Sequence, residues 1–164
     1  MIATFTDFGV NGPYLGQMKA VLFARAPGVP VIDLFPDLPP FDARAAAYLL
    51  PACARDLPPD CVCLCVVDPG VGTERLPVAV LADGRWYVGP DNGLFALVVR
   101  RATEVEAFAI SWRPSRLSDS FHGRDLFAPV AAMLACGRRP QMREIEPSSL
   151  ERASWPDDLP RIVY

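Results

Sequence analysis

The sequence predicts an α/β domain whose largely parallel sheet is flanked by helices. Short apolar segments alternate along the chain with segments in which apolar residues recur at helical spacing. Residues 62–67 form a continuous apolar run, which is typical of a strand that is covered on both faces. A length of 164 residues is enough for one domain with its own core and is short for two.

The first half of the chain predicts three strands that alternate with two helices. The strands are expected at residues 2–5, 29–35 and 62–67, and the helices at residues 13–26 and 42–56. Pro13 suits the first position of a helix. A backbone N–H at that position has no acceptor within the helix, so proline, which has no N–H, loses no hydrogen bond there. Pro27 and Gly28 end the first helix, and a proline-rich loop leads into the alanine-rich second one.

The second half predicts a hairpin, one more strand and two helices. The hairpin pairs residues 78–82 with 86–88, the strand covers residues 105–110, and the helices cover residues 93–101 and 124–136. Asp83 and Gly84 form the expected hairpin turn. Asn92 is a typical N-cap for the first of these helices, and Gly137 ends the second.

The end of the chain has no clear periodicity after Gly137 and is rich in proline. We therefore expect residues 1–140 to form the α/β domain and residues 141–164 to form a linker or arm. Residues 161–164 resemble the first residues of a strand, which favours a linker toward a further domain. A frayed C-terminal arm is the alternative.

Composition and charge argue against several classes of function. The net charge is −3 and no basic tract is present, so we expect no nucleic-acid partner. No apolar run approaches the roughly 20 residues that a membrane span needs, so we expect no membrane partner. The N-terminus lacks the basic and apolar regions of a signal peptide, which favours a cytoplasmic protein.

Three of the five cysteines, Cys61, Cys63 and Cys65, occupy alternate positions in and just before the expected strand at residues 62–67. Their side chains should therefore face the same side of the sheet. One interpretation is a metal or redox site. The other is a set of small buried apolar side chains. We favour the second, because no nearby histidine and no pair of cysteines at metal-binding spacing completes a ligand set. Reduced thiols fit a cytoplasmic setting.

Polar residues collect where the expected strands end. Asp7 follows the first strand, Asp68 follows the third, and Asp91 and Asn92 follow the hairpin. Ligands of open α/β sheets bind outside the carboxyl ends of the strands, so Asp7 and Asp68 are expected to share one crevice. A turn aspartate also has a structural use, because it accepts local backbone hydrogen bonds.

The segment Asp68–Gly72 (DPGVG) favours a functional role for Asp68. A carboxylate at the tip of a buried strand is followed by two glycines, which let the backbone approach a ligand closely. No third glycine follows at dinucleotide-binding spacing. Arg75 lies seven residues after Asp68, and we expect it to fold back, pair with the carboxylate and keep it ionised.

His122 is the only histidine of the chain. It lies just before an expected helix, where free backbone N–H groups favour negative charge. Gly123 beside it permits close approach of a ligand. A structural hydrogen-bonding role is the alternative. A metal site of His122 with Asp68, Asp91 or Asp125 is not favoured, because no second histidine is present.

Taken together, six segments in order resemble the SAM hydroxide adenosyltransferases, which hydrolyse S-adenosyl-L-methionine (SAM) and are related to fluorinating and chlorinating enzymes. The segments that carry the resemblance are Thr6–Gly9, Tyr14–Lys19, Pro39–Asp42, Val66–Gly72, Gly89–Gly93 and Phe121–Pro129. The resemblance covers nearly the whole chain as far as Gly137, and it implies a Rossmann-like layered domain.

The resemblance also implies a reaction and a set of site residues. Water attacks C5′ of the SAM ribose, and methionine leaves as a neutral thioether. The family's water-handling set corresponds to Asp68, Arg75 and His122. By the same transfer Asp7 holds the ribose hydroxyls, and Phe41 stacks near adenosine where fluorinating relatives have tryptophan. Asn92 and Gly123 are further expected pocket members. SAM is the substrate, and no cofactor or metal is expected.

Family members carry a smaller C-terminal β domain, and SAM lies between the N-terminal domain of one subunit and the C-terminal domain of its trimer neighbour. This chain ends where that domain begins, so we expect the domain to be absent and a homotrimer to form only when it is present. A carboxylate at position 68 repels chloride and fluoride, which favours hydrolysis over halogenation. The alternatives are adenosine or SAM binding without turnover, and a metal-dependent hydrolase.

Overall fold

The computed structural model of the protein describes residues 1–157 and residue 159. In this part of the chain seven strands form one sheet in the order β2-β1-β3-β5-β4-β6-β7. The strands are β1 (Ile2–Thr6), β2 (Val31–Phe35), β3 (Val62–Val66), β4 (Pro77–Ala82), β5 (Arg85–Pro90), β6 (Val105–Ile110) and β7 (Met142–Ile145). The predicted α/β class is confirmed.

The sheet is mixed, with a parallel half and an antiparallel half. β2, β1, β3 and β5 pair in parallel, as the alternation of strands and helices predicts. β4 pairs antiparallel with both β5 and β6, and β7 pairs antiparallel with β6. The predicted hairpin therefore introduces the reversal, because β4 runs against its two neighbours. As a consequence β6 runs in the same direction as the parallel strands.

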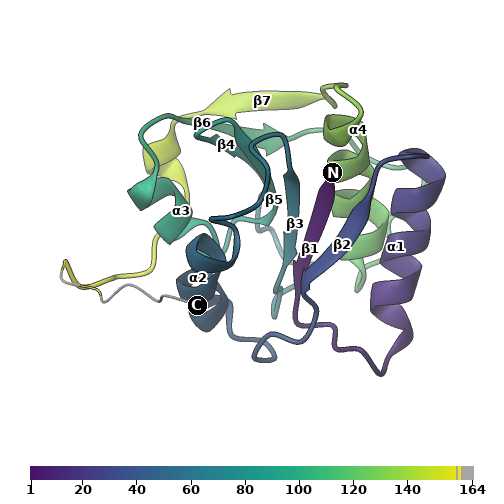
Figure 1. Cartoon of the computed structure of the whole chain (residues 1–164), viewed down its shortest axis with the longest axis horizontal. Helices are drawn as coiled ribbons and strands as arrows, with labels where there is room; N and C mark the ends of the chain where they lie inside the picture. The colour runs from purple at the N-terminus through teal and green to yellow at the C-terminus, as the bar shows by residue number, and fades with distance from the viewer. Residues whose placement is uncertain (158, 160–164) are drawn as a thin grey trace.

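Helices cover both faces of the sheet (Figure 1). The helices are α1 (Pro13–Arg25), α2 (Ala43–Cys53), α3 (Ala96–Arg101) and α4 (Ala128–Ala135), with a π-helical turn at Gly123–Phe127 and a 3₁₀ turn at Pro147–Ser149. Within the described residues, none of the helices has the length and apolar character that crossing a membrane requires.

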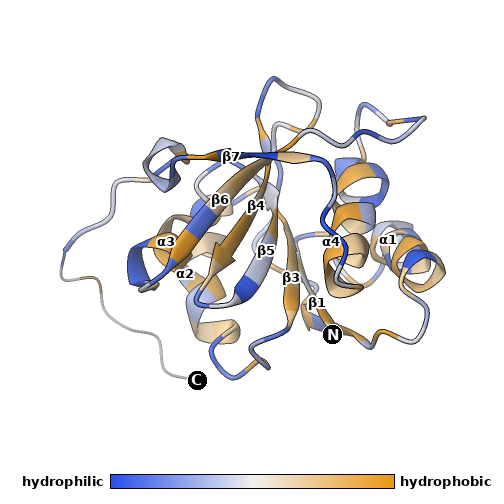
Figure 2. Cartoon of the chain, turned by 90° about the horizontal axis from the view of Figure 1, so that it is seen from above, coloured by the Kyte–Doolittle hydropathy of each residue, from blue (hydrophilic) through white to orange (hydrophobic). Residues whose placement is uncertain are grey.

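Two apolar clusters hold these layers together, one on each face of the sheet. Figure 2 shows apolar strands between the helices α2 and α3 on one side and α1 and α4 on the other. On the α1 and α4 face, Met18 and Val130 pack with Leu64. On the α2 and α3 face, Leu50 packs with Cys63. β3 is buried along its whole length because it receives helices on both sides, as its unbroken apolar sequence predicts.

Several local signals in the sequence act as predicted. Pro13 begins α1. The alanine-rich segment forms α2, and the structure adds that Asp42 caps it, because its side chain accepts a hydrogen bond of 2.8 Å from the amide of Ala45. Cys61, Cys63 and Cys65 lie in one apolar cluster, are buried, and carry free thiols, which is the second interpretation offered above.

Two helix starts differ from the prediction. Asn92 does not cap α3: its side chain accepts from the amide of Leu94 at 3.3 Å, so it closes a turn that precedes the helix at Ala96. The helix predicted from residue 124 begins with a π-helical turn and becomes α-helical at Ala128. π-Helical turns have no distinctive sequence signal and occur often at functional sites.

The segment after residue 140, where the sequence predicts an arm, contributes to the sheet. β7 pairs with β6 through register positions such as Ile145 opposite Ala107. Leu150 is buried in the cluster beneath α2 and α3. Trp155 stacks on Tyr48 of α2 with a ring-centroid distance of 6.1 Å. The predicted link to a further domain stays a prediction, and the strand expected at residues 161–164 lies outside the described residues.

Replacing Leu150 with alanine is expected to lower the free energy of unfolding by about 2–4 kcal/mol, because a buried leucine is lost from a packed cluster. Chemical denaturation of both forms measures the difference. Leu76→Ala is the matched control, since that leucine is 46% exposed and its loss should cost little. Equal stability of the two variants would show that residues after 140 do not belong to the folded unit.

Candidate active site

Functional candidates gather at one edge of the sheet, where the parallel strands end. Asp7 directly follows β1, and Asp68 lies two residues after the neighbouring strand β3. Phe41 lies in the loop that follows β2, and His122 lies in the long loop after β6. These strands run in the same direction, so all four residues come from loops at the same edge.

Asp68 and Arg75 form the predicted ion pair. The guanidinium Nη2 of Arg75 lies 2.5 Å from Oδ1 of Asp68, and the two side chains are 17% and 8% exposed. The intervening loop turns tightly, because the amide of Thr73 donates to the carbonyl of Gly70 at 3.2 Å and its hydroxyl does so at 2.8 Å. The loop therefore returns the arginine to the carboxylate that precedes it.

Burial is the largest influence on the Asp68 carboxyl and raises its pKa above the ordinary value. The positive charge of Arg75 lowers that pKa, and His122 lowers it further. The negative charge of Asp7 raises that pKa, as the last of these influences. A crevice shared by Asp7 and Asp68 stays a prediction, because Asp7 does not line the cavity that contains Asp68. The sequence predicted that pairing keeps Asp68 ionised; the pairing opposes the effect of burial but does not cancel it.

The two glycines of the Asp68 loop make close contacts that a side chain would prevent. A Cβ on Gly70 would lie 2.8 Å from Nη2 of Arg75. Gly72 has a φ of +84°, and a Cβ there would lie 2.7 Å from the carbonyl oxygen of Asp119. Gly70 thus leaves room for the guanidinium, and Gly72 lets this loop contact the loop that carries His122.

The variant Gly70→Ala should fold but lose the Asp68–Arg75 contact, because the flexible end of the arginine moves more easily than the backbone. With the cation displaced, the pKa of Asp68 should rise further. Titration of the labelled Asp68 carboxyl by NMR measures this. Gly16→Ala in α1 is the control, since a Cβ there meets nothing within 4 Å. An unchanged Asp68 titration in Gly70→Ala would contradict the expected displacement.

Asp68, Arg75 and His122 line one cavity of about 120 Å³ between the loop after β3 and the loop after β6. Its wall also includes Arg113, together with the apolar residues Leu76, Leu117, Leu126 and Phe127. The structure thus brings together the three residues that the family resemblance selects. The cavity offers a carboxylate, a guanidinium and an imidazole to one small space, which suits the binding and orientation of water.

Asp7 and Phe41 contact each other at the same edge of the sheet and do not line this cavity. Oδ2 of Asp7 accepts a hydrogen bond of 2.9 Å from the amide of Phe41. Its second oxygen, Oδ1, accepts no hydrogen bond from any described residue. Phe41 has a φ of 60° and its side chain is 74% exposed, so the loop presents this ring to solvent. One carboxylate oxygen and one aromatic face are therefore available to a ligand.

Gly123 and Asn92 are engaged by the protein itself. A Cβ on Gly123 would lie 2.9 Å from Cζ of Phe8, so the space beside this glycine is filled by an aromatic ring. Nδ2 of Asn92 donates to the carbonyl of Val67 at 2.8 Å, which holds the end of β3. Contacts of either residue with a substrate stay predictions.

Sequence reasoning did not single out Arg113 or Leu117 as cavity residues. Both precede His122 in the loop after β6, and the direction of that strand determines that they reach this edge. Their sequence context is ordinary, so only the pairing of β6 would have identified them. Among the described residues no group of three or more His, Cys, Asp or Glu side chains is arranged to hold a metal ion.

Comparison of the sequence with known proteins gives matches to one family. Residues 2–144 match the model of the SAM hydroxide adenosyltransferase N-terminal domain. The (R)-S-adenosyl-L-methionine hydrolase of Thermus thermophilus is 50% identical over 149 residues, which cover 83% of this chain and 57% of that protein. The hydrolase of the same name from Salinispora arenicola is 39% identical, with 94% and 61% covered.

More distant similarity and a solved structure agree with these matches. A fluorinase of an Actinoplanes species is 25% identical over 84% of this chain and 55% of its own length. A Thermotoga maritima protein of known crystal structure superposes with a TM-score of 0.89 at 34% identity, over 96% of this chain and 62% of that one. The chain spans less than two thirds of the length of each of these proteins.

Proposed function

Because the chain belongs to the SAM hydroxide adenosyltransferase family, we propose that it hydrolyses SAM to adenosine and L-methionine. The observation that carries this proposal is the single cavity lined by Asp68, Arg75 and His122 at the carboxyl edge of the sheet. Relatives named as SAM hydrolases, which are 35–50% identical to the chain, support it.

In the proposed reaction, a water molecule in the cavity attacks C5′ of the ribose in line with the C5′–S bond. The O–C5′ bond forms as the C5′–S bond breaks, and the electron pair of that bond goes to sulfur. Methionine leaves as a neutral thioether, so its departure needs no acid. The water proton passes to Asp68 and then to solvent. The raised pKa of Asp68 supports this role, because a stronger base accepts a proton more readily.

Arg75 and His122 have supporting roles in this proposal. Arg75 orients the carboxylate through its ion pair, and His122 completes the polar wall around the water. Holding water in line with a bond about to break removes much of the entropic barrier by positioning alone. The cavity of about 120 Å³ has room for only a few waters, since a water occupies about 30 Å³ of the liquid. We propose that most of SAM lies outside it, toward Asp7, since ligand sites are usually about 300–1,000 Å³.

The substrate contacts follow from the side chains that are free at this edge. Asp7 is proposed to accept hydrogen bonds from the ribose hydroxyls through its free oxygen. The exposed ring of Phe41 is proposed to stack near adenosine. Asn92 and Gly123 are proposed to contribute through the shape of the pocket, because the protein already uses their polar groups and space.

Incubation with SAM followed by chromatography for adenosine and methionine tests the proposal. The longest product of the gene should form both products in equal amounts, and its Asp68→Ala variant should not. Absence of product above that control would overturn the hydrolase proposal. Activity that survives exhaustive chelation would set aside the metal-dependent alternative, which would require a divalent ion at Asp68 and His122.

Binding without turnover is the second candidate. The observation that favours it is that the chain spans only 57–61% of the two SAM hydrolases compared above. The rest of those longer proteins lies outside the match, and we propose that it contributes to substrate binding. Calorimetry with adenosine distinguishes the two: binding without product formation supports this candidate, and no binding at millimolar adenosine rules it out.

We further propose a cytoplasmic setting, a homotrimer when a C-terminal β domain is present, and SAM as a substrate with no cofactor. Free thiols at Cys53, Cys61, Cys63, Cys65 and Cys136 support a reducing compartment. The aromatic side chains Tyr14 and Phe41, 52% and 74% exposed, support a contact of the sheet edge with another subunit. Sedimentation analysis of the longest gene product tests the trimer.

A further inference from the structure

The imidazole of His122 has no side-chain hydrogen bond to any described residue. It shares a cavity with the carboxylate of Asp68, whose pKa it lowers. A catalytic side chain usually has a partner that determines its orientation. Here the position of the ring must instead be determined by the backbone on either side of it. The residues that hold that backbone therefore control the geometry of the cavity.

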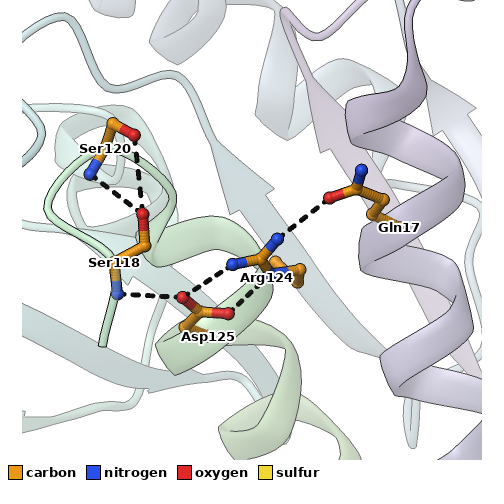
Figure 3. A network of polar contacts seen from close by, with 5 residues as sticks. All are labelled: Gln17, Ser118, Ser120, Arg124 and Asp125. Carbon is orange, nitrogen blue, oxygen red and sulfur yellow. Dashed lines mark hydrogen bonds and ion pairs between the residues drawn. The ribbon is translucent and has the colours of Figure 1, made fainter. Parts of the chain in front are cut away.

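Asp125 holds the backbone before His122. One of its oxygens, Oδ2, accepts a hydrogen bond of 2.9 Å from the amide of Ser118, four residues ahead of the histidine. Figure 3 shows Asp125 reaching from the π-helical turn to the loop that carries Ser118. The hydroxyl of Ser118 in turn accepts from the amide of Ser120 at 3.4 Å. The loop is thereby closed onto the turn that follows His122.

Arg124 connects the same turn to helix α1. Its Nε donates to Oδ1 of Asp125 at 2.6 Å and its Nη2 donates to Oδ2 at 3.0 Å, so the ion pair is bidentate. Its Nη1 donates to Oε1 of Gln17 at 3.0 Å. These contacts join α1, the π-helical turn and the loop before His122 into one network (Figure 3).

Aromatic packing supports the network from the side of the ribose site. The guanidinium of Arg124 lies 4.9 Å from the centre of the Phe121 ring. Phe121 packs edge-on against Tyr14 and Phe8, with ring-centroid distances of 5.1 Å and 5.6 Å. Phe8 follows Asp7 directly. The residue before His122 is thus fixed against the segment that carries the proposed ribose ligand.

We propose that Asp125 and Arg124 are positioning residues that place His122 in the cavity by holding Ser118 and Phe121. The pair acts on the reaction through His122 and does not itself line the cavity with Asp68. The Arg124 guanidinium holds the pKa of the Asp125 carboxyl below its ordinary value, so the network persists in mildly acidic solution. The catalytic part of this inference rests on the proposed function, but the placement of His122 does not.

The placement is tested by NMR of the imidazole, because the 164-residue chain contains one histidine. The wild type should give one sharp set of imidazole resonances. Asp125→Ala should broaden or split them, and Asp125→Asn should largely retain them, because an amide oxygen still accepts from Ser118. Asp33→Asn is the matched control: it removes an ion pair of 2.9 Å with Lys19, away from His122.

A folded Asp125→Ala protein with unchanged imidazole resonances would overturn the inference. If that variant does not fold, Arg124→Met provides the same test, because it removes the link to Gln17 and leaves Asp125 able to accept from Ser118. Its imidazole resonances should broaden, and unchanged resonances there would equally overturn the inference. Backbone amide spectra establish whether each variant is folded.

Turnover of SAM gives the second readout. Asp125→Ala should lower kcat about 10- to 100-fold with little change in the KM for SAM, since a misplaced group impairs reaction more than binding. Asp125→Asn should recover most of the rate. If the wild type hydrolyses no SAM, the proposed function fails while altered imidazole resonances still support the positioning role. If hydrolysis occurs and neither kcat nor the resonances respond to Asp125→Ala, the positioning role fails alone.

Discussion

Asp68→Asn is expected to lower the rate of SAM hydrolysis by about 10²- to 10⁴-fold, the usual contribution of a general base. The amide keeps the size and shape of the carboxylate but cannot accept a proton. The free energy of unfolding should fall by less than in Arg75→Met, because the amide is cheaper to bury than a carboxylate and its oxygen can still face the Arg75 guanidinium. Initial rates and chemical denaturation of the two forms measure both effects.

Asp33→Asn is the control for this comparison, since it also exchanges a carboxylate for an amide but lies on β2 beside Lys19. Its rate should equal that of the wild type. The affinity of Asp68→Asn for adenosine should also be retained, because Asp7 and Phe41 are unchanged. A rate for Asp68→Asn within a factor of a few of the wild-type rate would remove Asp68 from the proposed proton transfer.

Arg75→Met should lower the free energy of unfolding at neutral pH by about 3 kcal/mol, because it leaves a largely buried carboxylate without its cation. Methionine keeps the aliphatic volume of the side chain, so packing around the cavity should persist. SAM hydrolysis should fall as well, since the carboxylate loses the group that orients it. Denaturation of both forms over a range of pH separates the charge effect from packing.

The pH dependence of this loss has a definite sign. Burial raises the pKa of Asp68 in the folded state, and removal of Arg75 raises it further. A carboxyl with a raised folded-state pKa stabilises the fold below its unfolded pKa and loses that stabilisation as the pH rises through the folded pKa. The loss of unfolding free energy in Arg75→Met, relative to the wild type, should therefore be largest at neutral pH and shrink on acidification. The double variant Arg75→Met with Asp68→Asn should show no such trend; a constant deficit in Arg75→Met would contradict the account.

The sequence predicted most of the fold because its strongest signals are local. The unbroken apolar run at 62–67 identified the central strand, and Pro13 marked the start of α1. β7 was missed because an edge strand of four residues has only two partly buried positions, too few to show alternation. The π-helical turn was missed because its hydrogen-bond pattern depends on packing against neighbouring elements and not on residue type.

The site was predictable to the extent that its contacts are close in sequence or belong to the family pattern. The spacing of Asp68 and Arg75 across two glycines indicated their pairing. The filling of the space beside Gly123 by Phe8, and the hydrogen bond from Ser118 to Asp125, depend on how distant loops meet. No local sequence pattern indicates either contact. The balance between burial and Arg75 at Asp68 likewise requires the folded structure.

Hydrolysis of SAM in water labelled with heavy oxygen tests most directly whether water at the Asp68, Arg75 and His122 cavity attacks C5′ of the ribose. The label should appear in the 5′-hydroxyl of adenosine and not in methionine, and Asp68→Asn should suppress labelled product without weakening adenosine binding. Unlabelled adenosine, or cleavage that leaves the sulfur attached to the nucleoside, would contradict it.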